Sequence, residues 1–399
     1  MEDLSWASAS YPLKEIYVTS PSVDNRHLGD FKQLDVPPRL LLGPGPSNAH
    51  PRVLGALGMR QVGHLDPVFI GLMNEVQQLI RYAWQTDNQL TIPVSGTGSA
   101  AMEAAIANVV EPGDTVLVAN NGYFGDRLVD MAERYGAEVC QVTRPWGEVF
   151  TLDELRQAVE RHRPAVLAVV HAETSTGALQ PLEGVGPLCR EHDCLLLVDT
   201  VTSLGGVPLY VDDWQIDVAY SGAQKCLSCP PGVSPLTLGE RATAKLRARA
   251  SKVRSWYLDV SLLEKYWGDD RTYHHTAPIN MNYAIREALR LVAEEGLENR
   301  WARHRENAEY LWNGLAEMGI ECQVAEPHRA ISLTTAKVPA GVDPKAVCQR
   351  LLAEYNVEIA GGLGELAGKV WRIGLMGFNS RRENVELLLS ALRRVLPAY

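Results

Sequence analysis

The sequence predicts an α/β protein with a mostly parallel central sheet and a smaller α+β segment at its C-terminal end. From Leu40 onward, short and largely apolar runs alternate with helical stretches, which is typical of strands buried on both faces of a parallel sheet. The 399 residues also exceed the length at which one hydrophobic core usually keeps growing. We therefore expect two domains.

The expected elements of the first domain follow one another at short intervals. The helix at 100–110 should stop at Pro112-Gly113 and the helix at 281–295 at Gly296. Thr151 and Glu154 form a capping box that opens the helix at 152–162. The apolar runs predict strands at 89–94, 115–118, 165–170, 194–198 and 216–220, and the helical patterns cover 100–110, 152–162 and 281–295.

The last hundred-odd residues have a different pattern of expected elements, in which longer helices alternate with isolated strands. They predict helices at 299–318, 344–355 and 382–395 and strands at 330–335 and 370–375. Residues 1–36 show no sustained periodicity and resemble an extended arm. We accordingly divide the chain into an N-terminal arm (1–36), a large domain (37–290) and a small domain (291–399).

The amino-acid composition and net charge limit which partners and which cellular compartment are expected for the protein. The formal net charge of −10 disfavours a broad surface for nucleic acid or anionic membranes, both of which need a basic face. No apolar run approaches the roughly 20 residues that span a bilayer, and the acidic N-terminus lacks the features of a secretory signal. Seven thinly scattered cysteines favour a reducing compartment. We expect a cytoplasmic protein.

Three segments that follow expected strands carry candidate chemistry, because ligands gather at the carboxyl ends of parallel strands. Small residues at 95–99 (SGTGS) precede a helix, whose free amides favour a phosphate. Asp199 ends an apolar run, where a carboxylate needs a cation or several donors. Lys225 lies among small residues and prolines in SGAQKCLSCPPG (221–232), and a desolvated lysine becomes a nucleophile and proton shuttle.

Each of these signals also has an ordinary interpretation: a plain glycine turn, a helix cap and a solvated lysine. Together they form the set that pyridoxal 5'-phosphate requires, in which a lysine forms the Schiff base, a carboxylate keeps the ring nitrogen protonated and a helix end takes the phosphate. Arg372 is either the solvent-facing charge of its strand or a clamp for a substrate carboxylate.

Three motifs point elsewhere, and we give each a structural interpretation. Cys226 and Cys229 form a C-x-x-C pair, but no second pair or histidine spacing completes a metal site, and Pro230-Pro231 stands where a redox motif should open a helix. We interpret both cysteines as packing residues. Residues 362–367 match G-x-G-x-x-A, yet a strand rather than a helix follows, which favours a glycine turn over a dehydrogenase site.

The histidine pair His274-His275 is the third of these motifs. Adjacent side chains on an extended chain point apart, so we expect two loop residues rather than metal ligands. No metal site is expected anywhere in the chain.

With these residues in hand, the chain resembles the class V aminotransferases of fold type I, and within them the enzymes that act on alanine, serine and glyoxylate. The resemblance runs from about Leu40 to Val395. Its matching segments are LLLGPGPSN (40–48), SGTG (95–98), EPGD (111–114), ETSTG (173–177), LLLVDTVTSLGG (195–206), SGAQKCLSCPPG (221–232), YHHTAP (273–278), EGLENRW (295–301) and GGLGELAGKVWRIGLMG (361–377).

The resemblance implies a seven-stranded, mostly parallel sheet, pyridoxal 5'-phosphate as cofactor, and a homodimer with shared active sites. It makes Lys225 the Schiff-base lysine and proton shuttle, Asp199 the partner of the ring nitrogen, and Arg372 the grip on the substrate carboxylate, with Gly45 beside it. The other cofactor contacts that it implies are Thr97, Gly98 and Ser99 at the phosphate, Phe124 and Val201 on the ring, Thr174 near its hydroxyl, Gln224 next to the site, and Tyr273 and Thr276 from the neighbouring subunit.

The implied activity is ping-pong transfer of the amino group of alanine, or of serine, to glyoxylate, which gives glycine and pyruvate or hydroxypyruvate. Relatives carry tryptophan in place of Phe124 and histidine in place of Ser99, and these departures leave the donor preference open. Serine–glyoxylate transfer is one alternative, and a cofactor-bound accessory protein without turnover is another. A cysteine desulfurase is disfavoured because Cys322 and Cys348 lie within or beside regular elements.

Overall fold

The computed structural model describes residues 25–396 of the chain. Its contacts divide the chain into two compact units, residues 1–38 and 39–399. Within the first unit, residues 25–38 hold a turn and neither helix nor strand. Most of the arm expected over residues 1–36 therefore lies outside the described residues.

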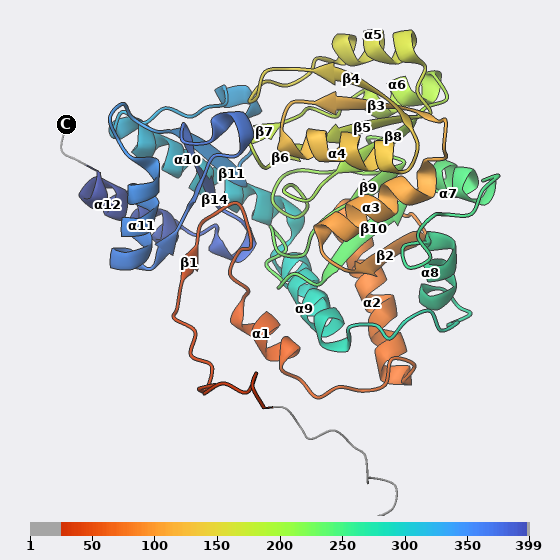
Figure 1. Ribbon diagram of the computed structural model, residues 1–399, viewed down its shortest axis with the longest axis horizontal. Coiled ribbons are helices and arrows are strands. Elements are labelled where there is room, and N and C mark those ends of the chain that lie inside the picture. The colour runs from red at the N-terminus through yellow and green to blue at the C-terminus, as the bar shows by residue number, and fades with distance from the viewer. Residues whose placement is uncertain (1–24, 397–399) are drawn as a thin grey trace, which may run out of the picture. The chain divides into compact units, whose positions relative to one another are not determined.

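The centre of the second unit is a seven-stranded sheet (Figure 1). All neighbouring strands run parallel except for one, β10, which is antiparallel to both of its neighbours. This confirms the mostly parallel sheet. Its strand order is β2 (Leu90–Ser95), β10 (Val233–Leu238), β9 (Val218–Tyr220), β8 (Leu195–Asp199), β5 (Val166–Val170), β3 (Thr115–Asn120) and β4 (Glu138–Thr143).

Both faces of this sheet are buried, and alternate residues of a strand serve opposite faces. Leu117 and Ala119 belong to one hydrophobic cluster, while Val116 and Val118 belong to another. Figure 1 shows α3 and α4 lying across the near side of the sheet. The second cluster includes residues of α3 (Gly98–Val109), α4 (Tyr123–Arg134) and α7 (Glu240–Arg247); the first includes residues of α2 (Pro67–Trp84), α5 (Leu152–His162), α6 (Val185–Glu191) and α9 (Ile279–Glu295).

The C-terminal part forms its own core. A three-stranded antiparallel sheet of β11 (Leu333–Lys337), β14 (Val370–Gly374) and β13 (Ala360–Gly361) shares this core with three helices, α10 (Leu297–Glu317), α11 (Pro344–Tyr355) and α12 (Arg382–Val395). The N-terminal strand β1 (Leu40–Leu41) pairs in parallel with β12 (Val357–Glu358), and Leu42 lies in this same core. Residues 40–42 thus pack with the C-terminal part.

The domain division that we expect near residue 290 falls inside α9, which continues to Glu295. It stays a prediction. The remaining elements of the described chain are α1 (Pro51–Leu57), α8 (Val260–Trp267), the small hairpin of β6 (Ala172–Glu173) and β7 (Ala178–Leu179), and three short 3-10 turns. Of the helices described, none has the length and apolarity to cross a membrane.

Helices α5, α11 and α12 begin and end where the sequence pattern predicts, and the capping box of Thr151 and Glu154 is present. Two strands of the central sheet, β4 and β10, are not predicted by the sequence pattern. Strand β4 lies at the sheet edge and is nowhere fully buried. Strand β10 contains Pro235, and a proline normally argues against a segment being a central strand. Here Pro235 stands opposite Pro93, so the two residues that lack an N–H occupy the same position in the strand pairing.

Candidate active site

Lys225 lies in a tight turn after β9, and its side chain is only 8% exposed. Its Nζ donates to the carbonyl of Pro44. The next residue, Gly45, has φ +106°, and a Cβ there would lie 2.5 Å from Lys225 Cδ and 2.8 Å from Nζ. Burial, and then the charge of Arg372, lowers the pKa of Lys225 to about 8. The desolvated lysine expected from the sequence is confirmed.

The two cysteines beside Lys225 are inert packing groups. Cys226 and Cys229 are fully buried free thiols, and burial raises the pKa of both, that of Cys226 to about 11. The described residues contain no cluster of three or more side chains able to hold a metal ion. The turn of residues 362–367 also follows its simpler interpretation, because it forms a 3-10 turn that leads into β14.

Asp199 ends β8 and is 2% exposed. The Tyr220 hydroxyl donates to Oδ2 over 2.7 Å, and the Val201 amide donates to Oδ1 over 2.8 Å. Burial raises the pKa of Asp199 to about 6, although these two hydrogen bonds oppose the shift. No cation in the described chain forms an ion pair with this carboxylate. A buried acid with two donors and no counter-ion fits a ligand that supplies positive charge.

The turn before α3 presents unused donors. The amides of Thr97, Gly98 and Ser99 donate to no acceptor within residues 25–396, and the Thr97 side chain makes no cap bond. Arg127 Nη1 donates to Ser99 Oγ over 3.2 Å, which brings a cation to the same place. Free amides at a helix N-terminus together with a guanidinium fit a phosphate.

Val201 and Gln224 adjoin this turn. A Cβ at Gly98 would lie 3.6 Å from Val201, and one at Gly222 would lie 3.4 Å from Val201, so Val201 packs between the two glycine turns. The buried Oε1 of Gln224 has no hydrogen-bond partner in the part of the chain described. An orphaned acceptor at this point fits a ligand that carries a donor.

Arg372 is 6% exposed, which excludes the solvent-facing alternative. Its Nε donates to the Gly361 carbonyl over 2.9 Å, and its Nη1 donates to the Thr174 carbonyl over 3.2 Å. Burial lowers the pKa of Arg372, opposed by the charge of Glu173. Its Nη2 has no acceptor among the described residues, so the guanidinium retains N–H groups for a carboxylate. The Thr174 hydroxyl lies 2.5 Å from that of Thr202.

Phe124 is the second residue of α4, and its amide donates to Glu173 Oε2 over 3.2 Å. The Arg127 guanidinium lies 4.8 Å from the centre of the Phe124 ring. Glu173 is fully buried and also accepts from the amide and the hydroxyl of Ser175 over 2.9 and 2.6 Å. Burial raises the pKa of Glu173 to about 7. This acid thus fixes the backbone that carries Phe124.

Tyr273 and Thr276 make no hydrogen bond to these residues in the described part of the chain, although His275 between them lies 2.6 Å from the Ser95 hydroxyl through its Nε2. Both are exposed in the loop between α8 and α9, and the ring of Tyr273 lies 5.2 Å from that of His64. His274 and His275 are loop residues, as expected, but they do not point apart: their Nδ1 atoms are 2.9 Å from each other, because the loop is bent there rather than extended.

Three side chains of this site are missing from the sequence-based set. Glu173 had a visible signal, since it is an acid that follows the apolar run 165–170 by three residues. Tyr220 and Arg127 had none, because their partners lie on other elements of the fold.

Fold and site together define a pyridoxal-phosphate enzyme: a buried lysine, a buried acid at the neighbouring strand end and a phosphate-type turn meet at one edge of a parallel sheet. The family model described as "Aminotransferase class-V" matches residues 52–388. The chain belongs to the class V aminotransferases. It is therefore an aminotransferase that uses pyridoxal 5'-phosphate.

Named relatives span most of the chain. The alanine–glyoxylate aminotransferase of Rattus norvegicus is 46% identical over 92% of this chain and 89% of its own length. The (S)-ureidoglycine–glyoxylate transaminase of Bacillus subtilis is 41% identical and covers 92% of both chains. A crystal structure of an alanine–glyoxylate aminotransferase from Nostoc sp. is 63% identical, covers 94% of this chain and 100% of its own, and superposes with a TM-score of 0.94.

The raised pKa of Asp199 predicts a pH-dependent stability. Its ordinary value is 3.8 and its folded value about 6, so the stability that the proton contributes is present below the ordinary value and is lost as the pH rises through 6. In the cofactor-free protein, Asp199→Asn should therefore raise the free energy of unfolding by up to about 3 kcal/mol at about pH 8 and by much less near pH 4.

Urea unfolding at the two pH values measures this difference. Asp130→Asn is the control, since Asp130 is an exposed acid on α4 that pairs with Arg134 and should give no such gain. An equal effect of Asp199→Asn at both pH values would contradict the prediction.

Proposed function

We propose that this aminotransferase transfers the amino group of alanine, or of serine, to glyoxylate, with Lys225 as the Schiff-base lysine. The observation that carries the proposal is the buried Lys225 amine, which shares one site with the buried carboxylate of Asp199 and the buried guanidinium of Arg372. The names of the Rattus norvegicus and Nostoc sp. relatives support the pairing of alanine with glyoxylate.

Bound pyridoxal 5'-phosphate would supply an aldehyde for the substrate amine and a protonated ring that withdraws electrons from the substrate α-carbon. Asp199 would hold the proton on the ring nitrogen. Its carboxylate is oriented by Tyr220 and Val201, and a cationic partner would lower its pKa from about 6, so that it stays charged at neutral pH.

Lys225 Nζ would take the proton from the substrate α-carbon and give it back in the reverse half-reaction. With a pKa of about 8, both the neutral and the protonated amine are accessible near neutral pH. General acid–base help of this kind contributes roughly 10²–10⁴-fold in rate. The hydrogen bond to the Pro44 carbonyl keeps the amine next to Gly45.

The remaining residues would hold the cofactor and the substrate. The free amides of Thr97, Gly98 and Ser99, with Arg127 nearby, support a phosphate at that turn, and the orphaned Gln224 oxygen adjoins it. Phe124 and Val201 would contact the ring, and Thr174 its hydroxyl. Arg372 would bind the substrate carboxylate beside Gly45, where a side chain would meet Lys225.

Loss of the lysine gives the sharpest test of this function. Lys225→Ala should abolish transfer, because it removes both the covalent attachment point and the proton shuttle. The measurement is an assay of alanine, serine and glutamate as donors against glyoxylate and pyruvate as acceptors. Borohydride reduction followed by peptide mass spectrometry should label Lys225 in the wild-type enzyme.

Lys337→Ala is the matched control, since Lys337 is an exposed lysine paired with Glu321. A Lys225→Ala enzyme that turns over at the normal rate would refute the role of Lys225. Strong transfer from serine with little from alanine would select the serine–glyoxylate alternative.

Arg372→Ala should mainly weaken binding of the substrate carboxylate. The loss of a charge-assisted pair at a buried site is worth about 1.5–3 kcal/mol, or roughly 10- to 100-fold in KM. An amine that lacks a carboxylate should react equally with wild-type and variant enzyme, and comparison of the two substrate types is the measurement. Arg350→Ala, at an exposed arginine paired with Glu354, is the control. Equal losses on both types of substrate would contradict the role.

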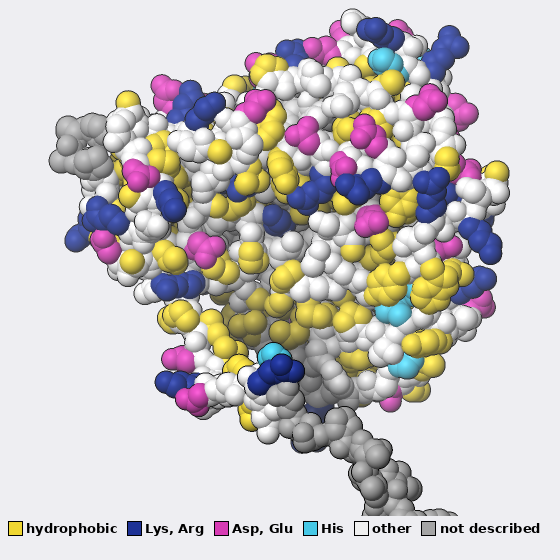
Figure 2. All heavy atoms as spheres, in the orientation of Figure 1, with side chains coloured by type: hydrophobic (Ala, Val, Ile, Leu, Met, Phe, Trp, Pro, Cys, Tyr) yellow, Lys and Arg dark blue, Asp and Glu magenta, His cyan; other side chains and the backbone are white. Residues whose placement is uncertain are grey.

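We also propose that the enzyme is a cytoplasmic homodimer with shared active sites. The seven free thiols support a reducing location. Figure 2 shows hydrophobic side chains gathered on the surface near α8, where Trp256, Tyr257 and Tyr273 are exposed. Large exposed apolar patches of this kind mark interaction surfaces. Tyr273 and Thr276, which make no hydrogen bond to the site of their own chain within residues 25–396, would complete that of the partner.

Mixed dimers test the sharing of the site. Tyr273→Ala should weaken retention of the cofactor, and Lys225→Ala should be inactive. Co-expression of the two variants with different tags should yield a mixed dimer with one intact site, because the Lys225→Ala subunit still supplies its Tyr273 to the other. Transfer activity and cofactor content of the doubly purified dimer are the measurements. A monomer in solution, or a mixed dimer without recovery, would exclude the shared site.

A further inference from the structure

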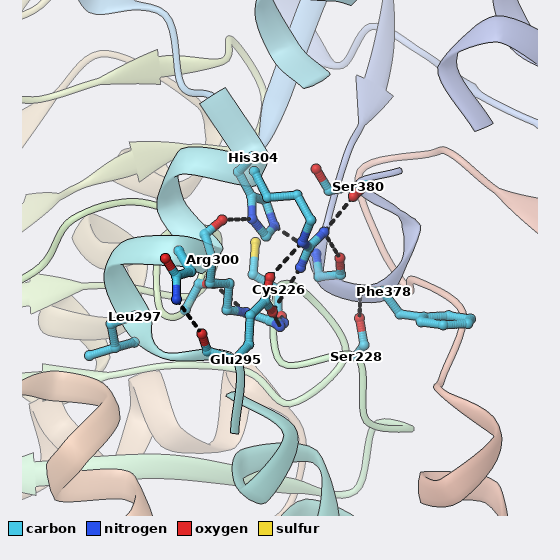
Figure 3. A network of polar contacts seen from close by, with 12 residues as sticks. Cys226, Ser228, Glu295, Leu297, Arg300, His304, Phe378 and Ser380 are labelled. Atoms are coloured by element: carbon cyan, nitrogen blue, oxygen red, sulfur yellow. Dashed lines mark hydrogen bonds and ion pairs between the residues drawn. The ribbon is translucent and has the colours of Figure 1, made fainter. Parts of the chain in front are cut away.

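A buried polar network lies next to the Lys225 turn. Figure 3 shows Arg300 and His304 of α10 reaching toward Cys226, Ser228 and the loop that carries Phe378 and Ser380. The proposed function uses none of these side chains. Arg300 nevertheless donates to the backbone carbonyl of Cys226, the residue after Lys225, and the Ser228 hydroxyl in the same turn accepts from the Phe378 amide.

Arg300 is the centre of the network. The residue is 5% exposed, and its Nη2 donates to the Cys226 carbonyl over 2.6 Å. Its Nε donates to the Gly205 carbonyl over 2.8 Å. Gly205 belongs to the turn that follows Asp199, whereas Cys226 directly follows Lys225. One guanidinium therefore joins the two turns that carry the acid and the amine.

These two turns touch closely at the same point. Gly206 lies so near to Cys226 that a Cβ there would be 2.4 Å from Sγ. The Cys226 thiol also donates weakly to the Thr202 carbonyl over 3.5 Å. The two turns thus pack directly on each other, and Arg300 links them by hydrogen bonds at the same point.

The backbone around Lys225 is fixed from two directions. Ser47 donates to the carbonyls of Gln224 and Lys225, through its amide over 2.9 Å and its hydroxyl over 2.7 Å. Arg300 takes the third carbonyl in succession, that of Cys226. Removal of Arg300 would leave a buried carbonyl unpaired on each turn.

Glu295 supplies the counter-charge. Its Oε2 accepts from Arg300 Nη1 over 2.7 Å, and its Oε1 accepts from Arg303 Nε over 2.6 Å. Although burial opposes ionisation, the hydrogen bond from Arg303 and the charge of Arg300 keep the pKa of Glu295 below its ordinary value. The charge of Arg300 is thereby balanced inside the protein.

Arg303 provides an internal comparison. It shares Glu295 with Arg300 and lies one helical turn further along α10, but its Nη1 donates to the carbonyls of Gly377 and Ser380 instead. His304 Nε2 accepts from the Gly377 amide over 3.0 Å. These contacts hold the loop after β14 and make no bond to the turns of Asp199 or Lys225.

We propose that Arg300 is a positioning residue for catalysis: its guanidinium ties the turn after Asp199 to the turn of Lys225 and so fixes the amine relative to the acid. This inference depends on the proposed role of Lys225. Arg300 contacts neither of the two side chains, so its effect passes through the Gly205 and Cys226 carbonyls. Small displacements of a reacting group are known to cost up to about 10²-fold in rate.

The experiment compares Arg300→Met, Arg300→Lys and the matched control Arg303→Met as holoenzymes. Three quantities are measured: kcat and KM for the amino donor, the absorbance spectrum of the bound cofactor, and the melting temperature. Arg300→Met should lower kcat on the order of 10- to 100-fold with little change in KM, and should shift the cofactor absorbance. Arg303→Met should melt at a similarly reduced temperature but keep the wild-type kcat and absorbance.

Arg300→Lys keeps the charge beside Glu295, yet a single ammonium cannot reproduce the fork that reaches two carbonyls. The kcat of Arg300→Lys should fall between those of wild type and Arg300→Met. Arg300→Lys replaces Arg300→Met in the comparison if Arg300→Met does not accumulate as folded protein. Wild-type kcat and absorbance in the Arg300 variants would overturn the proposal. So would equal losses of kcat in the Arg300 and Arg303 variants that follow the melting temperature.

Failure of the proposed function would look different. In that case the wild-type enzyme itself would show no cofactor absorbance and no borohydride label on Lys225, whatever stands at position 300.

Discussion

The structure depends on the burial of two ionisable groups at one edge of its central sheet. Burial raises the pKa of Asp199, and burial together with the charge of Arg372 lowers that of Lys225, so each group is pushed toward its neutral form. Such burial is unfavourable unless partners compensate. The chain offers Asp199 two hydrogen bonds and Lys225 one carbonyl, which orients both groups without neutralising either. A cofactor with a cationic ring and an aldehyde would satisfy both.

Sheet pairing explains why the acid is held so well. Strands β8 and β9 are parallel neighbours, and Asp199 stands opposite Tyr220 in their register. Paired residues project from the same face, so the Tyr220 hydroxyl reaches the carboxylate as a consequence of the register. The turn that leaves β9 then carries Lys225 back to the same edge. Two adjacent strand ends thus supply the acid, its orienting donor and the amine.

An element or a site residue can be predicted from the sequence where the signal lies within the segment itself. The periodicity of α12 and the capping box of α5 are local, and Asp199 and Lys225 are conspicuous because each interrupts an apolar or small-residue stretch. Strand β10 escapes because Pro235 argues against a central strand unless its partner, Pro93, is known. Arg300 escapes for a similar reason, since its carbonyl partners lie 95 and 74 residues away in the chain.

The two carbonyl partners of Arg300 lie on different turns, and this explains why position 300 holds an arginine. Two turns that meet in the interior leave carbonyls that neither turn can satisfy, and each unpaired carbonyl would cost about 1–3 kcal/mol. An apolar side chain would leave both unpaired, and a lysine would reach one. The planar guanidinium reaches both and still offers Nη1 to Glu295. Because Arg303 and His304 of the same helix hold the loop after β14, one stretch of α10 contacts the backbone near Asp199, Lys225 and Arg372.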